Sequence, residues 1–313
     1  MTIHYIEPSE DTLHGPFSKD RAAVMTIDSG DTVRFKTLDA GWGLEPFSEE
    51  GTRRQFEPRQ QGHALCGPVA VRGAKPGMVL EVQINNLVPG AWGWTSAGGF
   101  GHPVNKWLGL ADDEGLTLNW AIDNELITAT HPLGHQIALR PFMGVMGMPA
   151  DVDGMQPTAP PRFCGGNIDC KELTAGSTLY LPIAVEGGLF STGDGHGVQG
   201  DGEVSVTAIE CPMDLVDLTL TVRSDLHLSM PRAKTAAGWI TFGFHEDLNE
   251  ASMIALSQML DLMEELYGYT RKEALGLASL VVDLRITQIV NGAKGCHAIL
   301  RHDAISGLRP RVD

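Results

Sequence analysis

The sequence has no run of about 18 apolar residues, the length that a membrane-spanning helix requires. The amino-terminal stretch MTIHYIEPSEDTLHG also lacks the basic region and apolar run of a secretory signal peptide. Lysine and arginine are few, 23 against 39 acidic residues, and nowhere clustered. The formal net charge of −16 repels nucleic-acid backbones and anionic lipid surfaces. We therefore expect no nucleic-acid or membrane partner and a cytoplasmic location.

Cysteine is also scarce, and its spacing excludes two further classes of protein. The five cysteines are Cys66, Cys164, Cys170, Cys211 and Cys296. Their number is odd and no pair has CxxC spacing, which argues against a disulfide framework and against a zinc ribbon. We expect them to be reduced thiols, as in a cytoplasmic protein.

What the sequence does contain is a series of short β-prone segments separated by turn residues. Glycine and proline mark the turns, as at Lys75-Pro76-Gly77 and Gly187-Gly188. The expected strands are Thr32–Lys36, Met78–Asn85, Ile137–Leu139, Ser177–Val185, Glu203–Ile209 and Asp217–Val222. This spacing predicts a mainly β fold, a jelly-roll-like β-sandwich over residues 1–222, with no convincing helix inside it.

The pattern changes after about Arg223. From Asn249 to Tyr267 apolar residues recur every three or four positions and Gly268 follows, which predicts a helix. A second helix is expected to begin after Thr270. Strands are expected at Leu284–Ile289 and Cys296–Leu300, joined by a turn at Asn291-Gly292. Residues 223–313 are therefore predicted to form an appended α+β subdomain.

The stretch from Phe163 to Glu210 carries most of the functional signal. Asn167 and Asp169 are two residues apart, as are Asp194 and His196. In extended backbone the two members of such a pair project from one face. Two pairs on neighbouring strands therefore favour a shared metal ion.

Four ordered blocks of the chain resemble the acetamidase/formamidase family. They are GPVAVRGAKPGMVLEVQI (67–84), GGNIDCKELTAGSTLYLPIAV (165–185), GDGHGVQGDGE (193–203) and DLRITQIVNGAKGCHAIL (283–300). The resemblance implies a jelly-roll body with an α+β subdomain, self-association into a homodimer or higher homo-oligomer, and hydrolysis of a short amide such as formamide or acetamide to a carboxylate and ammonia.

Amide hydrolysis requires an activated nucleophile, oxyanion stabilisation and protonation of the departing ammonia. A zinc ion meets the first two needs, because it acidifies a bound water and polarises a carbonyl. Asp169, Asp194 and His196 are the expected zinc ligands. Three mixed nitrogen and oxygen ligands are typical of an open, catalytic zinc site.

Three further residues receive catalytic roles. Glu203 ends the glycine-rich loop and is the expected general base. His63 precedes the block that begins at Gly67, and we expect it to orient the substrate or pass a proton to ammonia. Asn167 either donates a hydrogen bond to the developing oxyanion or braces its own loop.

Three alternative hypotheses remain open from the sequence. In the first, the ion is Ca²⁺ or another divalent cation, since Asp169, Asp194, Asp201 and Glu203 make an oxygen-rich neighbourhood. In the second, the nucleophile is a thiol, that of Cys164 or Cys170. In the third, the chain is a jelly-roll protein that binds a small molecule without turning it over.

Overall fold

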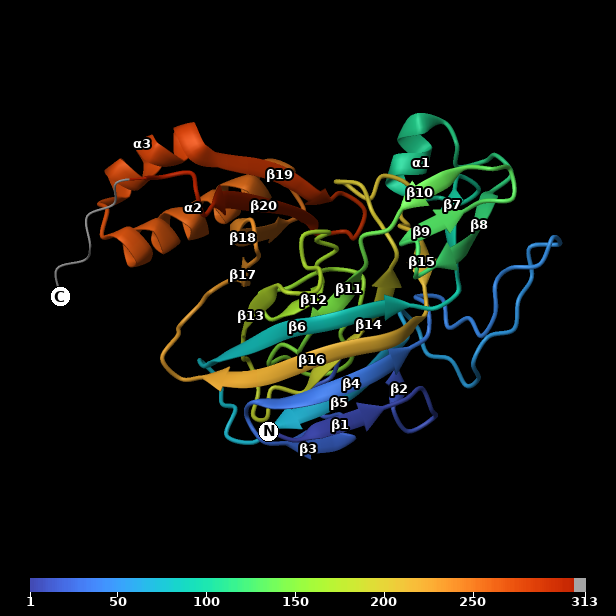
Figure 1. Ribbon diagram of the computed structural model, residues 1–313, viewed down its shortest axis with the longest axis horizontal. Coiled ribbons are helices and arrows are strands. Elements are labelled where there is room, and N and C mark those ends of the chain that lie inside the picture. The colour runs from blue at the N-terminus through green and yellow to red at the C-terminus, as the bar shows by residue number, and fades with distance from the viewer. Residues whose placement is uncertain (307–313) are drawn as a thin grey trace.

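The computed structural model describes residues 1–306, which form two large β-sheets and three helices (Figure 1). The prediction of a mainly β protein is therefore confirmed. No helix within these residues is long and apolar enough to cross a lipid bilayer.

The first sheet has nine strands and contains elements from both ends of the chain. In spatial order they are β1 (Ile3–Ile6), β4 (Asp31–Thr37), β16 (Met213–Arg223), β6 (Val79–Pro89), β13 (Thr178–Pro182), β17 (Arg232–Lys234), β18 (Gly238–His245), β20 (Lys294–Arg301) and β19 (Val282–Gln288). The strands of the predicted carboxy-terminal subdomain thus continue a sheet that begins in the amino-terminal body.

The second sheet has eleven strands and carries the candidate site. Its main path is β10 (Gln136–Ala138), β9 (Thr128–Thr130), β8 (Leu116–Asp123), β7 (Trp92–Ala97), β15 (Glu210–Cys211), β14 (Phe190–His196), β11 (Phe142–Gly147) and β12 (Gly165–Asn167). Three further strands, β2 (Leu13–His14), β3 (Met25–Ile27) and β5 (Leu65–Val71), join this sheet through the pairing of β5 with β14.

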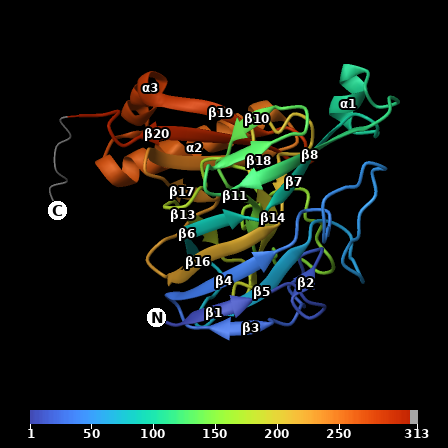
Figure 2. The ribbon, with the colours of Figure 1, turned by 45° about the vertical axis from the view of Figure 1, so that its right-hand side comes forward.

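The three helices begin at recognisable capping residues, and α1 and α2 end at left-handed glycines. Helix α1 (Pro103–Leu108) follows His102, whose side chain accepts the backbone N–H of Val104. Helix α2 (Leu248–Tyr267) ends at Gly268 in the left-handed conformation, as predicted. Helix α3 (Arg271–Val281) starts with a capping box between Thr270 and Glu273. Figures 1 and 2 show α2 and α3 beside β18, β19 and β20, away from α1.

Two sequence predictions are wrong at the level of single elements. The segment Glu203–Ile209 is a series of turns: none of its residues pairs in a strand, and Glu203 and Val206 have left-handed φ values of 47° and 73°, which break a regular strand. The region expected to lack helix contains α1, whose six residues are too few to show a helical period. The other predicted strands and both carboxy-terminal helices are present within a few residues.

The two sheets share one apolar core, and the helices build a second. Phe35 of β4 packs against Phe190 of β14, with ring centroids 6.5 Å apart. Met259 and Met263 of α2 pack instead with buried residues of β20 such as Ala298. A core on each side of the shared sheet explains how both helices and the second sheet are held to it.

His14 of β2 is buried between the strands and is held neutral. Its Nδ1 lies 3.2 Å from the carbonyl oxygen of Pro16 and its Nε2 lies 2.9 Å from Ser191 Oγ. Burial, followed by repulsion from Arg21, lowers the pKa of His14 to about 4. A neutral imidazole donates to the Pro16 carbonyl and accepts from the Ser191 hydroxyl.

Acidification should therefore destabilise the protein through His14. Between the unfolded pKa and the lower folded pKa, only the unfolded chain binds the proton, so stability falls as pH drops. From about pH 7 to about pH 5 the expected loss through this residue is about 2 kcal/mol in the free energy of unfolding. Urea titrations across this range should show a flatter profile for His14→Gln than for the wild type or for His135→Gln, a control at an exposed histidine. Parallel profiles for all three proteins would contradict the assignment.

Candidate active site

The site lies on β14, a strand whose seven residues are all buried. His196 pairs with Phe142 of the neighbouring β11 and with Glu210 of β15. Asp194 interrupts the regular strand with a φ of 61°. Strand β14 thus lies in the interior of its sheet, and its polar side chains are buried away from bulk water.

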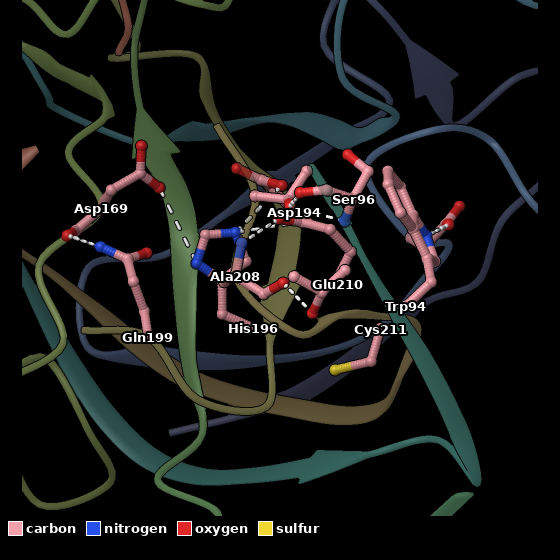
Figure 3. Close-up of polar contacts among 12 residues, drawn as sticks. Trp94, Ser96, Asp169, Asp194, His196, Gln199, Ala208, Glu210 and Cys211 are labelled. Carbon is pink, nitrogen blue, oxygen red and sulfur yellow. Dashed lines mark hydrogen bonds and ion pairs between the residues drawn. The ribbon is translucent and has the colours of Figure 1, made fainter. Parts of the chain in front are cut away.

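His196 lies between buried carboxylates on two sides, Asp169 on one and Asp194 and Glu210 on the other (Figure 3). Its Nδ1 lies 3.9 Å from Asp169 Oδ1. Its Nε2 lies 3.4 Å from Asp194 Oδ1 and 3.3 Å from Glu210 Oε2. The ring of Phe142 meets the imidazole edge-on, with centroids 4.9 Å apart. Both nitrogens of one histidine therefore face acidic side chains.

The carboxylates divide into two groups that share His196. Asp169 and Glu203 form one group with it, and Asp194 and Glu210 form the other. Within each group the potential ligand atoms lie within 4.8 Å of one another. The predicted zinc ligands Asp169, Asp194 and His196 thus lie together, but on opposite sides of the imidazole. Their role as a single ligand set stays a prediction.

Glu210 is a site residue that the sequence interpretation missed. It follows Ile209 and precedes Cys211, both almost fully buried, and is itself 3% exposed. A carboxylate within a buried apolar segment is costly unless it is paired or binds a cation, so it marks a functional position. This signal was present in the sequence. The incorrect strand Glu203–Ile209, which ended one residue earlier, obscured it.

Gly144 of β11 lies next to a carboxylate from each of the two acidic groups. A methyl group at its Cα would lie 2.6 Å from Asp169 Oδ1 and closer still to Asp194 Oδ2. Both carboxylates therefore point at the space in front of this glycine. Only a residue without a side chain leaves that space free.

The donor set fits a divalent cation. Within the part of the chain that the structure describes, Asp169 Oδ1, Glu210 Oε2 and both ring nitrogens of His196 are buried without a hydrogen-bond partner. Buried polar atoms are nearly always paired, and an ion is one of the accepted explanations for exceptions. Oxygen and imidazole ligands suit zinc and other divalent metals.

The pKa values show how strongly the cluster resists carrying several negative charges. Burial, with repulsion from Asp169, raises the pKa of Glu203 well above its usual range. Burial also raises the pKa of Glu210 to about 7 and that of Asp169 to about 6. Burial opposes ionisation of Asp194 too, but attraction to His63 and His196 outweighs it and lowers this pKa. A bound cation would relieve this repulsion.

Asp169 is held in place by residues from two distant segments. Gln199 donates its side-chain N–H to the Asp169 carbonyl oxygen at 2.9 Å. Asn291 donates to Asp169 Oδ2 at 2.5 Å. Asn291 was predicted only as part of a hairpin turn, and its distance of 122 residues from Asp169 in sequence explains why no local pattern placed it here.

Asn291→Ala is expected to lower kcat/KM for the short amide that the sequence resemblance implies by about 10- to 100-fold, because partners that orient a carboxylate at a metal site contribute on this scale. The matched control is Asn86→Ala at an exposed position of β6, which should leave the rate unchanged. Steady-state kinetics and metal content measured on both variants test this role. Equal activity of the two variants would show that Asn291 has only a turn-forming role.

The loop that carries Glu203 is fixed to the end of β19. The backbone N–H of Gly202 donates to Thr287 at 3.0 Å, and that of Ile289 donates to the Gly202 carbonyl at 3.1 Å. Glu203 itself is 6% exposed. Its carboxylate is therefore held beside His196 rather than swinging in from solvent.

His63 and Asn167 lie in different parts of this neighbourhood. His63 Nδ1 is 2.8 Å from Thr158 Oγ1, and both residues line a cavity of about 310 Å³. The electrostatic influence of His63 reaches Asp194. Asn167, on β12, is buried, and its Oδ1 finds no hydrogen-bond partner among residues 1–306. Their catalytic roles stay predictions.

The thiols are poorly placed for nucleophilic attack. All five cysteines are buried and free. Burial raises the pKa of Cys164 to about 11 and that of Cys170 well above its usual range. The reactive form of cysteine is the thiolate, which these environments disfavour. The geometry therefore favours the carboxylate and histidine cluster as the chemical centre.

The fold and site together define a mainly β protein of two large sheets with a buried histidine–carboxylate centre suited to a divalent cation. The sequence model of the Acetamidase/Formamidase family matches residues 4–155 and 152–302. The chain belongs to that family.

Individual relatives agree with this assignment. The acetamidase of Mycolicibacterium smegmatis is 30% identical over 250 residues, 61% of each protein. The chain spans about three fifths of the length of the curated relatives it matches. A "recombinant predicted acetamidase/formamidase" from Thermoanaerobacter tengcongensis superposes with a TM-score of 0.85 and 26% identity over 96% of both chains. The acetamidase of Bacillus halodurans gives 0.82 and 25%, covering 95% of this chain and 97% of its own.

Proposed function

We propose that this protein hydrolyses a short-chain aliphatic amide of the formamide or acetamide type to a carboxylate and ammonia. The observation that carries the proposal is the convergence of Asp169, Asp194, Glu203 and Glu210 on one buried histidine. Membership of the acetamidase/formamidase family supports the choice of substrate class. A protein that only bound a small molecule would not need four carboxylates with opposed pKa shifts.

In this proposal Asp169, Asp194 and one of the two ring nitrogens of His196 would hold a divalent cation, for which zinc is our choice. Both carboxylates point at the space in front of Gly144. When bound, such an ion supplies Lewis-acid polarisation of the amide carbonyl and lowers the pKa of water. Phe142 packs on the edge of His196 and restricts rotation of the ring. Asn291 and Gln199 keep Asp169 in position.

The proton transfers fall to Glu203 and His63. Glu203 accepts the proton of the attacking water, a role for which a carboxyl group with a raised pKa is suited. His63 lines the cavity of about 310 Å³ and is assigned the protonation of departing ammonia. Asn167 is assigned hydrogen bonding to the oxyanion. A second cavity, of about 650 Å³, lies against Glu203 and offers apolar contacts to the acyl group from Leu118, Ile137 and Ile209.

Metal removal tests the proposal directly. Ammonia release from formamide, acetamide and propionamide is measured for as-purified, chelator-stripped and zinc-restored protein, with a calcium-restored sample as a parallel arm. We expect stripping to reduce the rate by at least about 100-fold and zinc to restore it, since metal polarisation accounts for several kcal/mol of transition-state stabilisation. Activity unaffected by stripping would refute metal dependence. If no sample released ammonia from any of the three amides, the proposed substrate class would be refuted.

The finer features of the molecule are proposals of the same kind. We propose a jelly-roll-like sandwich for residues 1–222 and an α+β subdomain for residues 223–313, of which 307–313 lie outside the described residues. The subdomain would contribute to a homodimer or higher oligomer in the cytoplasm. Light scattering of the purified protein measures the assembly.

A further inference from the structure

We propose that Cys170, Glu172 and His297 form a second binding site for a divalent cation of the zinc class, separate from the cluster around His196. All three residues are buried, with exposed fractions of 0%, 8% and 0%. Cys170 Sγ, one carboxylate oxygen of Glu172 and one ring nitrogen of His297 lie within 4.8 Å of one another. Cys170 and Glu172 follow β12, whereas His297 lies on β20, so the site would link the two sheets.

The spacing between His297 and Glu172 fits a shared ion better than a direct hydrogen bond, whereas the Cys170 thiol lies within ordinary hydrogen-bonding distance of Glu172. Glu172 Oε2 is 3.5 Å from Cys170 Sγ and 3.6 Å from His297 Nε2. A tetrahedral zinc site with bonds of 2.0–2.3 Å separates its ligand atoms by roughly 3.3–3.8 Å. A hydrogen bond from imidazole to carboxylate is normally near 2.9 Å, and a contact at 3.6 Å is not one.

His297 is oriented as a metal ligand is. Its Nδ1 lies 2.7 Å from Thr287 Oγ1 on the adjacent strand. Its Nε2 is buried and finds no hydrogen-bond partner in the described part of the chain. Metal-bound histidines nearly always have the second nitrogen fixed by a neighbour in this way. The orphaned nitrogen faces Glu172 and is thus the observation that points to a ligand.

The carboxylate of Glu172 is held in position by Arg285, which binds the oxygen that does not face Cys170 and His297. Arg285 Nη1 donates to Glu172 Oε1 at 2.8 Å, which leaves Oε2 directed at Cys170 and His297. Arg285 also pairs with Asp201, and Lys171 Nζ lies 3.0 Å from the same aspartate. Two positive charges thus face one negative charge at Asp201, and Arg285 also carries the remaining positive charge to Glu172.

Charge and ligand type select the ion. Binding releases the thiol proton of Cys170, so a thiolate, a carboxylate and a neutral imidazole together carry a charge of −2. A divalent cation balances this charge. Sulfur and imidazole ligands favour zinc, cobalt or iron over calcium or magnesium.

Cobalt(II) substitution tests this site by a signal that the first site does not produce. The His196 cluster offers only oxygen and nitrogen ligands, so a thiolate-to-cobalt absorption band reports on Cys170 alone. Chelator-stripped protein is titrated with Co²⁺, and bound metal is counted per chain. We expect a thiolate-to-cobalt band in the wild type. Cys170→Ser should lose this band and about one bound cobalt per chain. The control Cys164→Ser, which replaces a buried thiol outside the cluster, should keep the band.

A second variant, at another proposed ligand, keeps the test valid if Cys170→Ser fails to fold. His297→Gln, on the other sheet, should weaken cobalt binding at this site at least about tenfold while the far-ultraviolet circular dichroism stays that of the wild type. No thiolate band in the wild type, or a band that persists in Cys170→Ser, would overturn the proposal. Because the band is read without any amide, its outcome is independent of the proposed hydrolysis.

Discussion

Gly144→Ala is expected to abolish amide hydrolysis while the protein still folds. The added methyl group would occupy the space into which Asp169 Oδ1 and Asp194 Oδ2 point, at 2.6 Å from the first and closer to the second. Both carboxylates would have to move apart. Displacement of a catalytic group by about 1 Å costs about 100-fold in rate, so we expect a loss of kcat/KM of at least that size. Overpacking should cost about 1–3 kcal/mol of stability.

The matched control is Gly276→Ala in α3. A methyl group there meets no atom within 4 Å, and the glycine lies in the helix interior. Alanine is the better helix former, so this variant should be about 0.5–1 kcal/mol more stable and fully active. Ammonia release, metal content and urea unfolding are measured on both. Full activity of Gly144→Ala would show that the space between the two carboxylates is not where the chemistry occurs.

Glu203→Gln is expected to lower kcat by about 100- to 10,000-fold with little change in KM, because it removes the proposed general base and keeps the shape of the side chain. Bound metal should stay at the wild-type level. This expectation follows from the proposed ligand set of Asp169, Asp194 and His196, which does not include Glu203, although Glu203 lies beside His196 in one of the groups that could hold a metal. The rate is followed by ammonia release and the metal by elemental analysis.

Glu186→Gln, an exposed carboxylate outside the cluster, is the control and should be fully active. A Glu203→Gln protein that loses its metal along with its activity would make Glu203 a ligand of the Asp169–His196–Glu203 group instead of the base. Unchanged kcat with normal metal content would remove Glu203 from the mechanism.

Features that depend on neighbours in sequence were predicted well. Alternating apolar residues and turn glycines located seven of the twenty strands in the described residues, since side chains of a strand alternate between faces. The caps Thr270 and Gly268 marked helix ends, because capping is a local hydrogen-bonding effect. Asp194 and His196 lie on one strand two residues apart, and their association was visible for the same reason.

Features that depend on pairing between distant segments required the tertiary structure. Asn291 reaches Asp169 only because β19 ends beside the loop that holds Glu203. Glu210 meets His196 because β15 pairs with β14, and no spacing in the sequence encodes that pairing. Gly144 matters through the space it leaves, which exists only once β11 lies beside β14.

The sequence by itself determined the β-rich class, the helix ends, the family and the segment that carries Asp169, Asp194 and His196. The tertiary structure alone decided that these residues lie on two sides of one imidazole and that Glu210 joins them. The physical reason is that backbone preferences and capping act over a few residues. A buried polar centre instead arises where long-range sheet pairing brings several segments together and excludes water from their side chains.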